Sequence, residues 1–221
     1  FLFDDQTWTV RYIVGDTRKW LPGRKVLISP ISIGSAEEST QTLSIGLTKD
    51  QIKDSPPLES DAPLSRQYEI IFNKYHDWGN YWEGPLTWGH HPFPRLLQRN
   101  EDVQTEVATV ENDNHLRSSQ EVLSYAIAAT DCDIGHIEDF IVDEETWIIR
   151  YLVIDTSNWL PGRKVIISPE WVERVEWANC SAVVTVTSEQ IKKSPEYDPN
   201  VILDRDYETA LYNFYGLPYY W

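Results

Sequence analysis

The feature of this sequence that most constrains its fold is an internal repeat. Residues 8–30 read WTVRYIVGDTRKWLPGRKVLISP and residues 147–169 read WIIRYLVIDTSNWLPGRKVIISP, so the second segment follows the first by 139 positions without a gap. The same offset aligns identical residues within 48–56, 66–69 and 81–82 with those within 187–195, 205–208 and 220–221. An ungapped match of this length predicts that the chain contains two copies of one small domain.

The repeat defines the boundaries that we expect along the 221 residues. The first copy spans residues 1–82, a Pro/Gly-rich and then acidic linker spans residues 83–116, and the second copy spans residues 117–221. Connecting segments of this length are usually linkers or binding segments, and we expect this one to be extended and only partly ordered.

The first copy is shorter than the second at its beginning. Phe1 aligns with Phe140, so the segment that precedes Phe140 has no counterpart in the first copy. A barrel that lacks a strand exposes an unpaired edge. We therefore expect either that the natural chain extends before Phe1 or that residues 103–110, whose side chains alternate as in a strand, fill the gap.

Short strands are predicted throughout the second copy. Residues 147–154 form an apolar and β-branched run interrupted only by Arg150, which is typical of a central strand. The sequence Leu160-Pro161-Gly162 suits a type II turn, because glycine readily takes the positive φ that this turn requires. Further strands are expected at residues 125–130, 136–142, 164–168, 171–177 and 181–186. Many short strands with turns every 8 to about 12 residues predict an all-β barrel or sandwich.

Each copy is also expected to contain short helices after its strands. Thr187 and Gln190 have the spacing of a capping box, in which each side chain bonds the backbone N–H of the other residue. Thr48 and Gln51 repeat this pattern in the first copy. Residues 203–215 carry apolar side chains at helical spacing and predict an amphipathic helix.

Four motifs of the second copy together resemble the PRC-barrel family. They are IGHIED at residues 134–139, RYLVI at residues 150–154, LPGRKV at residues 160–165 and QIKKSP at residues 190–195. The chain as a whole is similar to tandem PRC-barrel proteins of bacteria. Cys132 departs from the family pattern, which commonly has glycine at that turn.

The resemblance implies two tandem six-stranded PRC-type β-barrels, each followed by short helical segments. Such a barrel forms the cytoplasmic domain of the photosynthetic reaction centre H subunit and the C-terminal domain of the ribosome maturation factor RimM. In those relatives the barrel is a docking surface on a larger assembly. The resemblance therefore implies a docking role for this chain as well.

Composition argues against several classes of function. The formal net charge is -16 at pH 7, whereas nucleic-acid binding needs clustered Lys and Arg. No apolar run approaches the roughly 20 residues that cross a bilayer, and the beginning of the chain does not read as a signal peptide. We therefore expect a cytoplasmic protein that binds no nucleic acid. Cys132 and Cys180 fit neither a disulfide framework nor a zinc pattern and are predicted to be reduced thiols.

Neither catalysis nor a bound cofactor is expected. The sequence has no nucleophile motif and no Gly-rich phosphate loop after a strand, and its five histidines lack the spacing of transition-metal ligands. Acidic residues near the first hairpin of the second copy are oxygen donors of the kind that calcium takes. Their alternation along a strand instead favours solvated charges. These residues are Asp131, Asp133, Glu138, Asp139, Asp143, Glu144 and Glu145.

Two arginines lie inside predicted apolar strands and need partners there. Arg11 is expected to pair with Asp16 or with loop carbonyls. Arg150 is expected to do the same with Asp155 or with loop carbonyls. A structural role is therefore favoured over a catalytic one.

Aromatic residues are the candidates for an interaction surface. The chain contains 10 Trp and 12 Tyr, more than small cores bury fully, and these residue types dominate binding hot spots. The candidate residues are Trp20, Tyr81, Trp82, Trp159, Tyr219, Tyr220 and Trp221. The favoured interpretation is that each aromatic tail covers its own barrel or joins the two barrels. The alternative is that the tails bind a partner.

The sequence thus predicts a non-enzymatic protein-interaction or adaptor module built from duplicated PRC-barrels. Its protein partner is not identified, and both packing of the two barrels on each other and a homo-oligomer are left open. One alternative is a regulatory or assembly component of a photosynthetic or electron-transfer complex, resembling the H subunit. Another is a metal-dependent hydrolase that uses the acidic hairpin.

Overall fold

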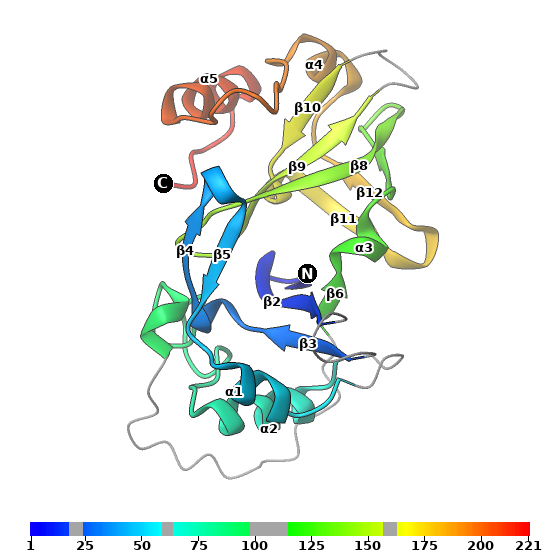
Figure 1. The fold of residues 1–221 in the computed structure, drawn as a ribbon. Coiled ribbons are helices and arrows are strands. Elements are labelled where there is room, and N and C mark those ends of the chain that lie inside the picture. The colour runs from blue at the N-terminus through cyan, green and yellow to red at the C-terminus, as the bar shows by residue number, and fades with distance from the viewer. Residues whose placement is uncertain (18–23, 59–63, 98–114, 157–162) are drawn as a thin grey trace. The chain divides into compact units, whose positions relative to one another are not determined.

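A computed structural model of the chain describes residues 1–17, 24–58, 64–97, 115–156 and 163–221 (Figure 1). Contacts divide the chain into two compact units. Unit 1 contains Phe1–Ser119 together with Asp143–Ile148, and unit 2 contains Gln120–Val142 together with Ile149–Trp221. Each unit therefore corresponds to one copy of the repeat, except that residues 83–119 and the turn at 143–148 belong to unit 1.

Unit 1 contains a four-stranded antiparallel sheet with the strand order β3-β2-β1-β6. These strands are β1 (Leu2–Asp4), β2 (Thr9–Asp16), β3 (Lys25–Ile28) and β6 (Leu116–Ser118). β6 pairs with the edge of β1 that β2 leaves free. An ion pair of 2.8 Å between Arg117 Nε and Asp5 Oδ2 adds to this pairing. The second edge of β1 is thus covered by a segment assigned to the linker and the start of the second copy, whereas residues 103–110, which were expected to fill the gap left by the missing hairpin, lie outside the described residues.

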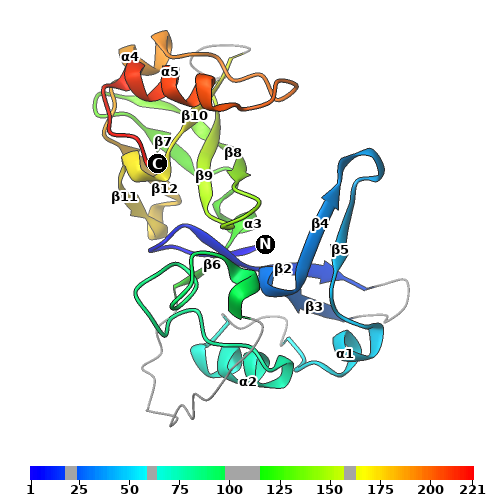
Figure 2. The ribbon, with the colours of Figure 1, turned by 90° about the vertical axis from the view of Figure 1, so that its left-hand side faces the viewer.

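The remaining elements of unit 1 are a separate hairpin and short helices. The hairpin consists of β4 (Ile33–Glu37) and β5 (Thr42–Ile45), which form a two-stranded sheet of their own. Figure 2 shows it projecting from β2 and β3. The helices are η1 (Pro30–Ser32), η2 (Glu38–Thr40), α1 (Lys49–Asp54), α2 (Arg66–His76) and η3 (Pro94–Leu97).

Unit 2 contains one six-stranded sheet with the strand order β10-β9-β8-β7-β12-β11. Its strands are β7 (Ala126–Ala128), β8 (Asp133–Val142), β9 (Ile149–Asp155), β10 (Lys164–Ile167), β11 (Val172–Glu176) and β12 (Ser181–Val184). The pairing of β7 with β12 is parallel, and the other pairings are antiparallel. The helices are η4 (Pro169–Trp171), η5 (Trp177–Asn179), α4 (Ser188–Lys193) and α5 (Arg205–Tyr215), and α3 (Ser119–Val122) begins at the boundary of the units.

Secondary structure recurs in the two units at the spacing of the sequence repeat. Seven pairs of elements begin and end 139 residues apart: β3 and β10, η1 and η4, β4 and β11, η2 and η5, β5 and β12, α1 and α4, and α2 and α5. Both predicted capping boxes form, at Thr48 with Gln51 and at Thr187 with Gln190. Local structure therefore follows the repeat even where the surroundings differ.

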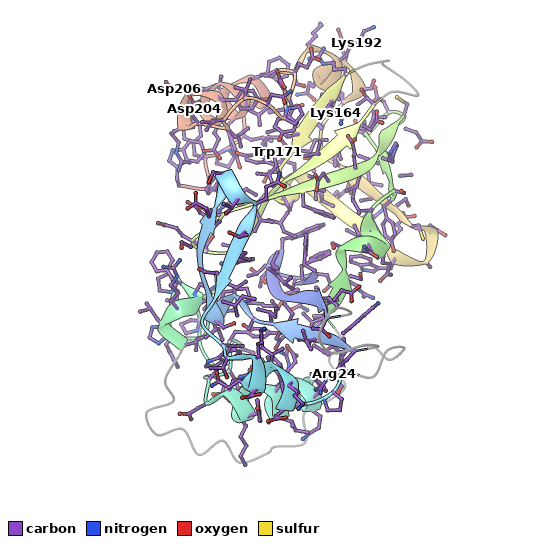
Figure 3. The ribbon with its side chains drawn as sticks, in the orientation of Figure 1. Arg24, Lys164, Trp171, Lys192, Asp204 and Asp206 are labelled. Carbon is purple, nitrogen blue, oxygen red and sulfur yellow. The ribbon has the colours of Figure 1, made fainter. Side chains whose placement is uncertain are left out.

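The arginine of the repeated LPGRKV motif anchors the helix that follows the strands. Arg24, labelled in Figure 3, donates to the backbone oxygens of Lys53 and Ser55 at the end of α1. In unit 2, Arg163 donates to the backbone oxygens of Lys192 and Ser194 at the end of α4. Because the last carbonyls of a helix have no partner within the helix, these bonds satisfy backbone oxygens at the same place in both copies of the repeat.

The predicted all-β class and closed barrels are not what the structure shows. It is strand-rich, but none of its three sheets closes into a barrel within the described residues. In unit 2 the strands β10 and β11 form the two outer edges of an open sheet. Helices contribute to each unit as well, because α2 buries Phe72 and α5 buries Leu211 and Tyr212. In unit 2, Trp171 packs edge-to-face on Tyr212 with ring centroids 5.1 Å apart.

Part of the expected linker belongs to the core of unit 1. Trp88 has no exposed surface, and its indole Nε1 donates to the backbone oxygen of Thr146 at 2.8 Å. Leu97 is also buried in the cluster that contains Trp88. The Pro/Gly-rich composition therefore marked a folded loop at residues 83–97, because turns tolerate these residues as readily as linkers do. In the described part of the chain, every helix is too short or too polar to cross a membrane.

Candidate functional site

The two units carry the same arrangement of arginine, tyrosine, glutamate and tryptophan side chains, which we call the Arg-Tyr-Glu cluster. Its members in unit 1 are Arg11, Tyr12, Arg66, Glu69, Tyr81 and Trp82. Its members in unit 2 are Arg150, Tyr151, Arg205, Glu208, Tyr220 and Trp221. Every member recurs 139 positions later. A central strand supplies the first two side chains, the first turn of an eleven-residue helix the next two, and the aromatic tail the last two.

A buried carboxylate is the centre of the cluster in unit 1. Glu69 Oε1 accepts hydrogen bonds from the hydroxyls of Tyr12 at 3.0 Å and Tyr81 at 2.8 Å. Its Oε2 forms an ion pair of 2.9 Å with Nη1 of Arg66, one helical turn away. Two hydroxyl donors and one guanidinium thus satisfy a carboxylate that is 2 % exposed.

The same bonds form around Glu208 in unit 2. Its Oε1 accepts hydrogen bonds from the hydroxyls of Tyr151 and Tyr220, each at 2.8 Å. Its Oε2 pairs with Nη1 of Arg205 at 2.9 Å. The carboxylates of the two units therefore have equivalent partners.

Cation–π contacts join the aromatic tails to the arginines of the strands and helices. The guanidinium of Arg11 lies 3.8 Å from the ring centroid of Tyr81, and that of Arg150 lies 4.2 Å from the ring centroid of Tyr220. The helix arginines contact the terminal tryptophans in the same way. Arg66 lies 4.0 Å from the ring of Trp82 and Arg205 lies 4.2 Å from the ring of Trp221.

Burial controls the protonation of the cluster. It raises the pKa of Glu69, against the lowering effect of Arg66 and the two tyrosine hydroxyls. Burial also raises the pKa of Tyr81 and of Tyr151 far above the ordinary tyrosine range. These tyrosines therefore remain protonated hydrogen-bond donors at neutral pH, which suits a structural role.

Arg11 obtains further partners from loops, as predicted. It donates to the backbone oxygen of Thr87 at 2.6 Å and to Oγ1 of Thr7 at 3.2 Å. It also forms an ion pair of 3.5 Å with Asp4. Because the side chain is nearly fully buried, these bonds replace the water that the guanidinium loses on folding.

The clusters differ in how far solvent reaches them. In unit 1 the loop at residues 83–97 covers the cluster, with the Trp88 ring 4.8 Å from the guanidinium of Arg11. Tyr81 is only 6 % exposed there. In unit 2 the side chain of Arg205 is 54 % exposed, whereas that of Arg66 is 9 % exposed. The cluster is thus covered in unit 1, whereas in unit 2 Glu208 and Tyr151 are buried but Arg205 and Trp221 are exposed.

Two aromatic side chains of the tail of unit 2 are exposed beside the cluster. Tyr219 is 43 % exposed and Trp221 is 46 % exposed. Their rings are stacked, with centroids 4.6 Å apart and an interplanar angle of 18°. The Tyr219 hydroxyl donates to Oδ1 of Asn213 on α5 at 2.6 Å. We call the surface formed by Arg205, Tyr219 and Trp221 the tail surface.

The candidate residues from the sequence thus fall into three groups. Tyr81 and Trp82 belong to the covered cluster of unit 1, and Tyr219, Tyr220 and Trp221 belong to unit 2. Trp20 and Trp159 lie outside the described residues. Sequence reasoning missed the carboxylates at the centre of the clusters, although the repeat had already aligned Glu69 with Glu208.

The acidic residues of the hairpin do not gather into a metal site in the described part of the chain. No group of three His, Cys, Asp or Glu side chains there has the arrangement that a metal ion needs. Glu144 and Glu145 instead line a cavity of about 570 Å³ in unit 1. The other lining residues are Gly34, Ser35, Ala36, Phe93, Arg95 and Leu96. Cys132 and Cys180 are exposed free thiols.

Comparison with known proteins gave no match, either to a protein-family model or to a curated protein. The resemblance to the PRC-barrel family therefore stays a prediction from the motifs.

Proposed function

We propose that this protein is a non-enzymatic protein-interaction or adaptor module that docks a protein partner on the tail surface of unit 2. The observation that supports the proposal is the difference between the equivalent tails. Tyr81 is almost fully buried and Trp82 is partly buried, whereas their counterparts are Tyr220, which is partly buried, and Trp221, which is 46 % exposed beside Tyr219 at 43 %. Large aromatic side chains exposed together on a folded unit are typical of binding surfaces.

The contacts around the tail surface favour binding because they hold its side chains in place. Trp221 is stacked on Tyr219 and lies under the guanidinium of Arg205. The Tyr219 hydroxyl is held by its hydrogen bond to Asn213 on α5. Arg205, which is itself on α5, is held by its ion pair with Glu208. The side chains of the tail surface would therefore lose less conformational entropy on binding a partner than freely rotating side chains would.

We also infer that the two units descend from one duplicated domain of the PRC-barrel type. The equal spacing of seven pairs of elements supports this ancestry, and so does the recurrence of the complete Arg-Tyr-Glu cluster. The six strands of unit 2 agree in number with such a barrel. Binding to a larger assembly, as in the resembling proteins, is the role that we extend to this chain by analogy.

The test is affinity capture of proteins from the native cell with three forms of the protein. They are the wild type, the double variant Y219A/W221A, and the control L43A/I71A, which removes two side chains that are exposed in unit 1. We expect one protein to be captured by the wild type and the control but not by Y219A/W221A. Equal capture by all three forms, with circular dichroism confirming that each is folded, would contradict the proposal.

The assembly role resembling the H subunit and the metal-dependent hydrolase remain alternative predictions. Elemental analysis of the purified protein separates the hydrolase from the docking module. A stoichiometric metal ion would favour the hydrolase, because hydrolysis by the acidic hairpin requires one.

A further inference from the structure

We propose that the cavity of unit 1 binds an apolar zwitterion, which is a free amino acid or a short peptide with an apolar side chain and both of its charged end groups. This inference concerns a different unit and a different surface from the proposed docking function, so one can fail without the other. It depends on the volume of the cavity and on the charges and apolar side chains of its lining.

Three segments of unit 1 form the walls of the cavity. They are residues 34–36 of β4, residues 93–96, and the pair Glu144 and Glu145. The volume is about 570 Å³, and sites for small organic ligands usually have volumes of roughly 300 to 1,000 Å³. The cavity is therefore of the size that holds an organic molecule, which is much larger than a metal ion.

Each wall is fixed to the body of unit 1 by a neighbouring residue. Ile33 directly precedes the first wall and is 4 % exposed, and Leu97 directly follows the second wall and is 7 % exposed. The backbone oxygen of Leu97 also accepts a hydrogen bond of 3.1 Å from the backbone nitrogen of Gly79. Thr146 directly follows the third wall, and its backbone oxygen accepts the hydrogen bond from Trp88. Walls that are held in this way lose little conformational entropy when a ligand binds.

The lining carries charges of both signs. Glu144 and Glu145 lie on one wall and Arg95 lies on another, and all three side chains are exposed to solvent. Two neighbouring carboxylates attract an ammonium group. A guanidinium binds a carboxylate through two parallel hydrogen bonds. The ligand that fits both walls therefore has an ammonium group and a carboxylate group.

Two apolar side chains complete the lining. Phe93 is 39 % exposed and Leu96 is 53 % exposed, although both belong to a folded wall of the cavity. Contact with an apolar group of the ligand would remove this surface from water and so favour binding. Amino acids and short peptides with aromatic or branched aliphatic side chains combine such a group with the two charges.

The two copies of the repeat differ at the first wall. Gly34, Ser35 and Ala36 have small side chains, whereas the residues 139 positions later are Glu173, Arg174 and Val175. The second copy thus places longer side chains on the equivalent strand. An arginine at position 35, as in the second copy, would fill space that the small residues leave to a ligand.

The first experiment compares charged and blocked ligands by isothermal titration calorimetry with the full chain. The probes are L-phenylalanine and the dipeptide L-leucyl-L-phenylalanine, and tighter binding of one or the other distinguishes a free amino acid from a peptide as the ligand. N-acetyl-L-phenylalanine lacks the ammonium group, and L-phenylalaninamide lacks the carboxylate. We expect at least one probe to bind and each blocked form to bind about tenfold or more weakly than L-phenylalanine, because each loses a charge-assisted contact.

Variants of the protein assign the two charges of the ligand to the two walls. In E144Q/E145Q the acetylated form should bind as well as L-phenylalanine does, and in R95Q the amide should do so. S35R should abolish binding by filling the cavity. D50N/D54N is the matched control, because it removes two exposed carboxylates of unit 1 that do not line the cavity, and it should bind as the wild type does. Y219A/W221A should also bind as the wild type does, since these residues belong to unit 2.

Three results would overturn the proposal. They are failure of both probes to bind, equal affinity of the wild type for the charged and blocked forms, and binding that S35R leaves unchanged. Circular dichroism of each variant establishes that a loss of binding does not reflect unfolding.

Discussion

Unit 1 and unit 2 share their local elements but differ in which parts are covered. Unit 2 has the hairpin that joins β9 to β12, and its residues Leu152, Val184 and Ile191 are fully buried, whereas their counterparts Ile13, Ile45 and Ile52 in unit 1 are only partly buried. Unit 1 has the loop at residues 83–97, which buries its Arg-Tyr-Glu cluster. Each unit thus buries residues whose counterparts in the other unit are more exposed. The comparison teaches that the segments flanking the repeat decide which of its residues are available to a partner.

The largest loss of unfolding free energy is expected when Trp88, which covers the Arg-Tyr-Glu cluster of unit 1, is replaced. Trp88→Ala removes a side chain with no exposed surface and its hydrogen bond to Thr146. It should lower the free energy of unfolding by about 3–5 kcal/mol, as is usual for a buried tryptophan. Urea unfolding measures this change. Trp221→Ala, at an exposed position of unit 2, is the control and should lower it by less than about 1 kcal/mol. Similar values for the two variants would break the comparison.

The carboxylates at the centres of the clusters are both buried, but the arginine that pairs with each is covered in unit 1 and exposed in unit 2. Glu69→Gln removes the charge that pairs with a buried Arg66 and should cost about 2–3 kcal/mol of unfolding free energy. Glu208→Gln should cost only about 1 kcal/mol, because the side chain of Arg205 is 54 % exposed and water can solvate it. Urea unfolding of both variants measures the difference. A larger loss for Glu208→Gln would show that solvent exposure does not set the strength of the cluster.

A histidine that occurs only in unit 1 should give this unit a pH dependence that unit 2 lacks. Burial lowers the pKa of His76 from 6.5 to about 4, and its ring is stacked on Trp78 at 4.4 Å. As the pH falls, the unfolded chain therefore takes up a proton at His76 before the folded chain does. The contribution of His76 to stability is fully present above pH 6.5 and is lost as the pH decreases toward 4. The counterpart of His76 is Tyr215, which does not titrate in this range.

His76→Tyr should remove this dependence. Allowing for the partial exposure of the ring, the wild type should lose about 1–2 kcal/mol more than the variant between pH 7 and about 4.5. Urea unfolding at a series of pH values makes the measurement. Parallel pH profiles for the two proteins would show that His76 is solvated in the folded state.

The smallest effect is expected where the units are most alike. Thr48→Ala and Thr187→Ala each remove the side chain of a complete capping box. Each should destabilise its helix by about 1 kcal/mol. Hydrogen exchange of the amides of α1 and α4 measures the two effects separately. A clear inequality would mean that packing of the buried Ile191, rather than the cap, dominates the stability of α4.

Predictions from short-range patterns agreed with the structure more closely than those that depended on distant contacts. The helix predicted at residues 203–215 is observed at Arg205–Tyr215, and the strand predicted at 164–168 is observed at Lys164–Ile167. The cluster could have been found from the repeat, because Arg66 and Glu69 recur with Tyr81 at the same spacing. Trp88 gave no such signal, since its burial depends on a contact with Thr146, which is 58 positions away.

The sequence by itself determined the repeat, the caps of its helices and the spacing of its strands. These features depend on hydrogen bonds and side-chain periodicity within a few residues, as in the bond between Thr187 and Gln190. The tertiary structure alone decided that Leu2 pairs with Ser118, that the described sheets remain open and that Arg66 is covered while its counterpart Arg205 is exposed. Those outcomes depend on which distant segment pairs best with an open strand edge or packs best on an apolar face. Local sequence patterns do not determine that choice.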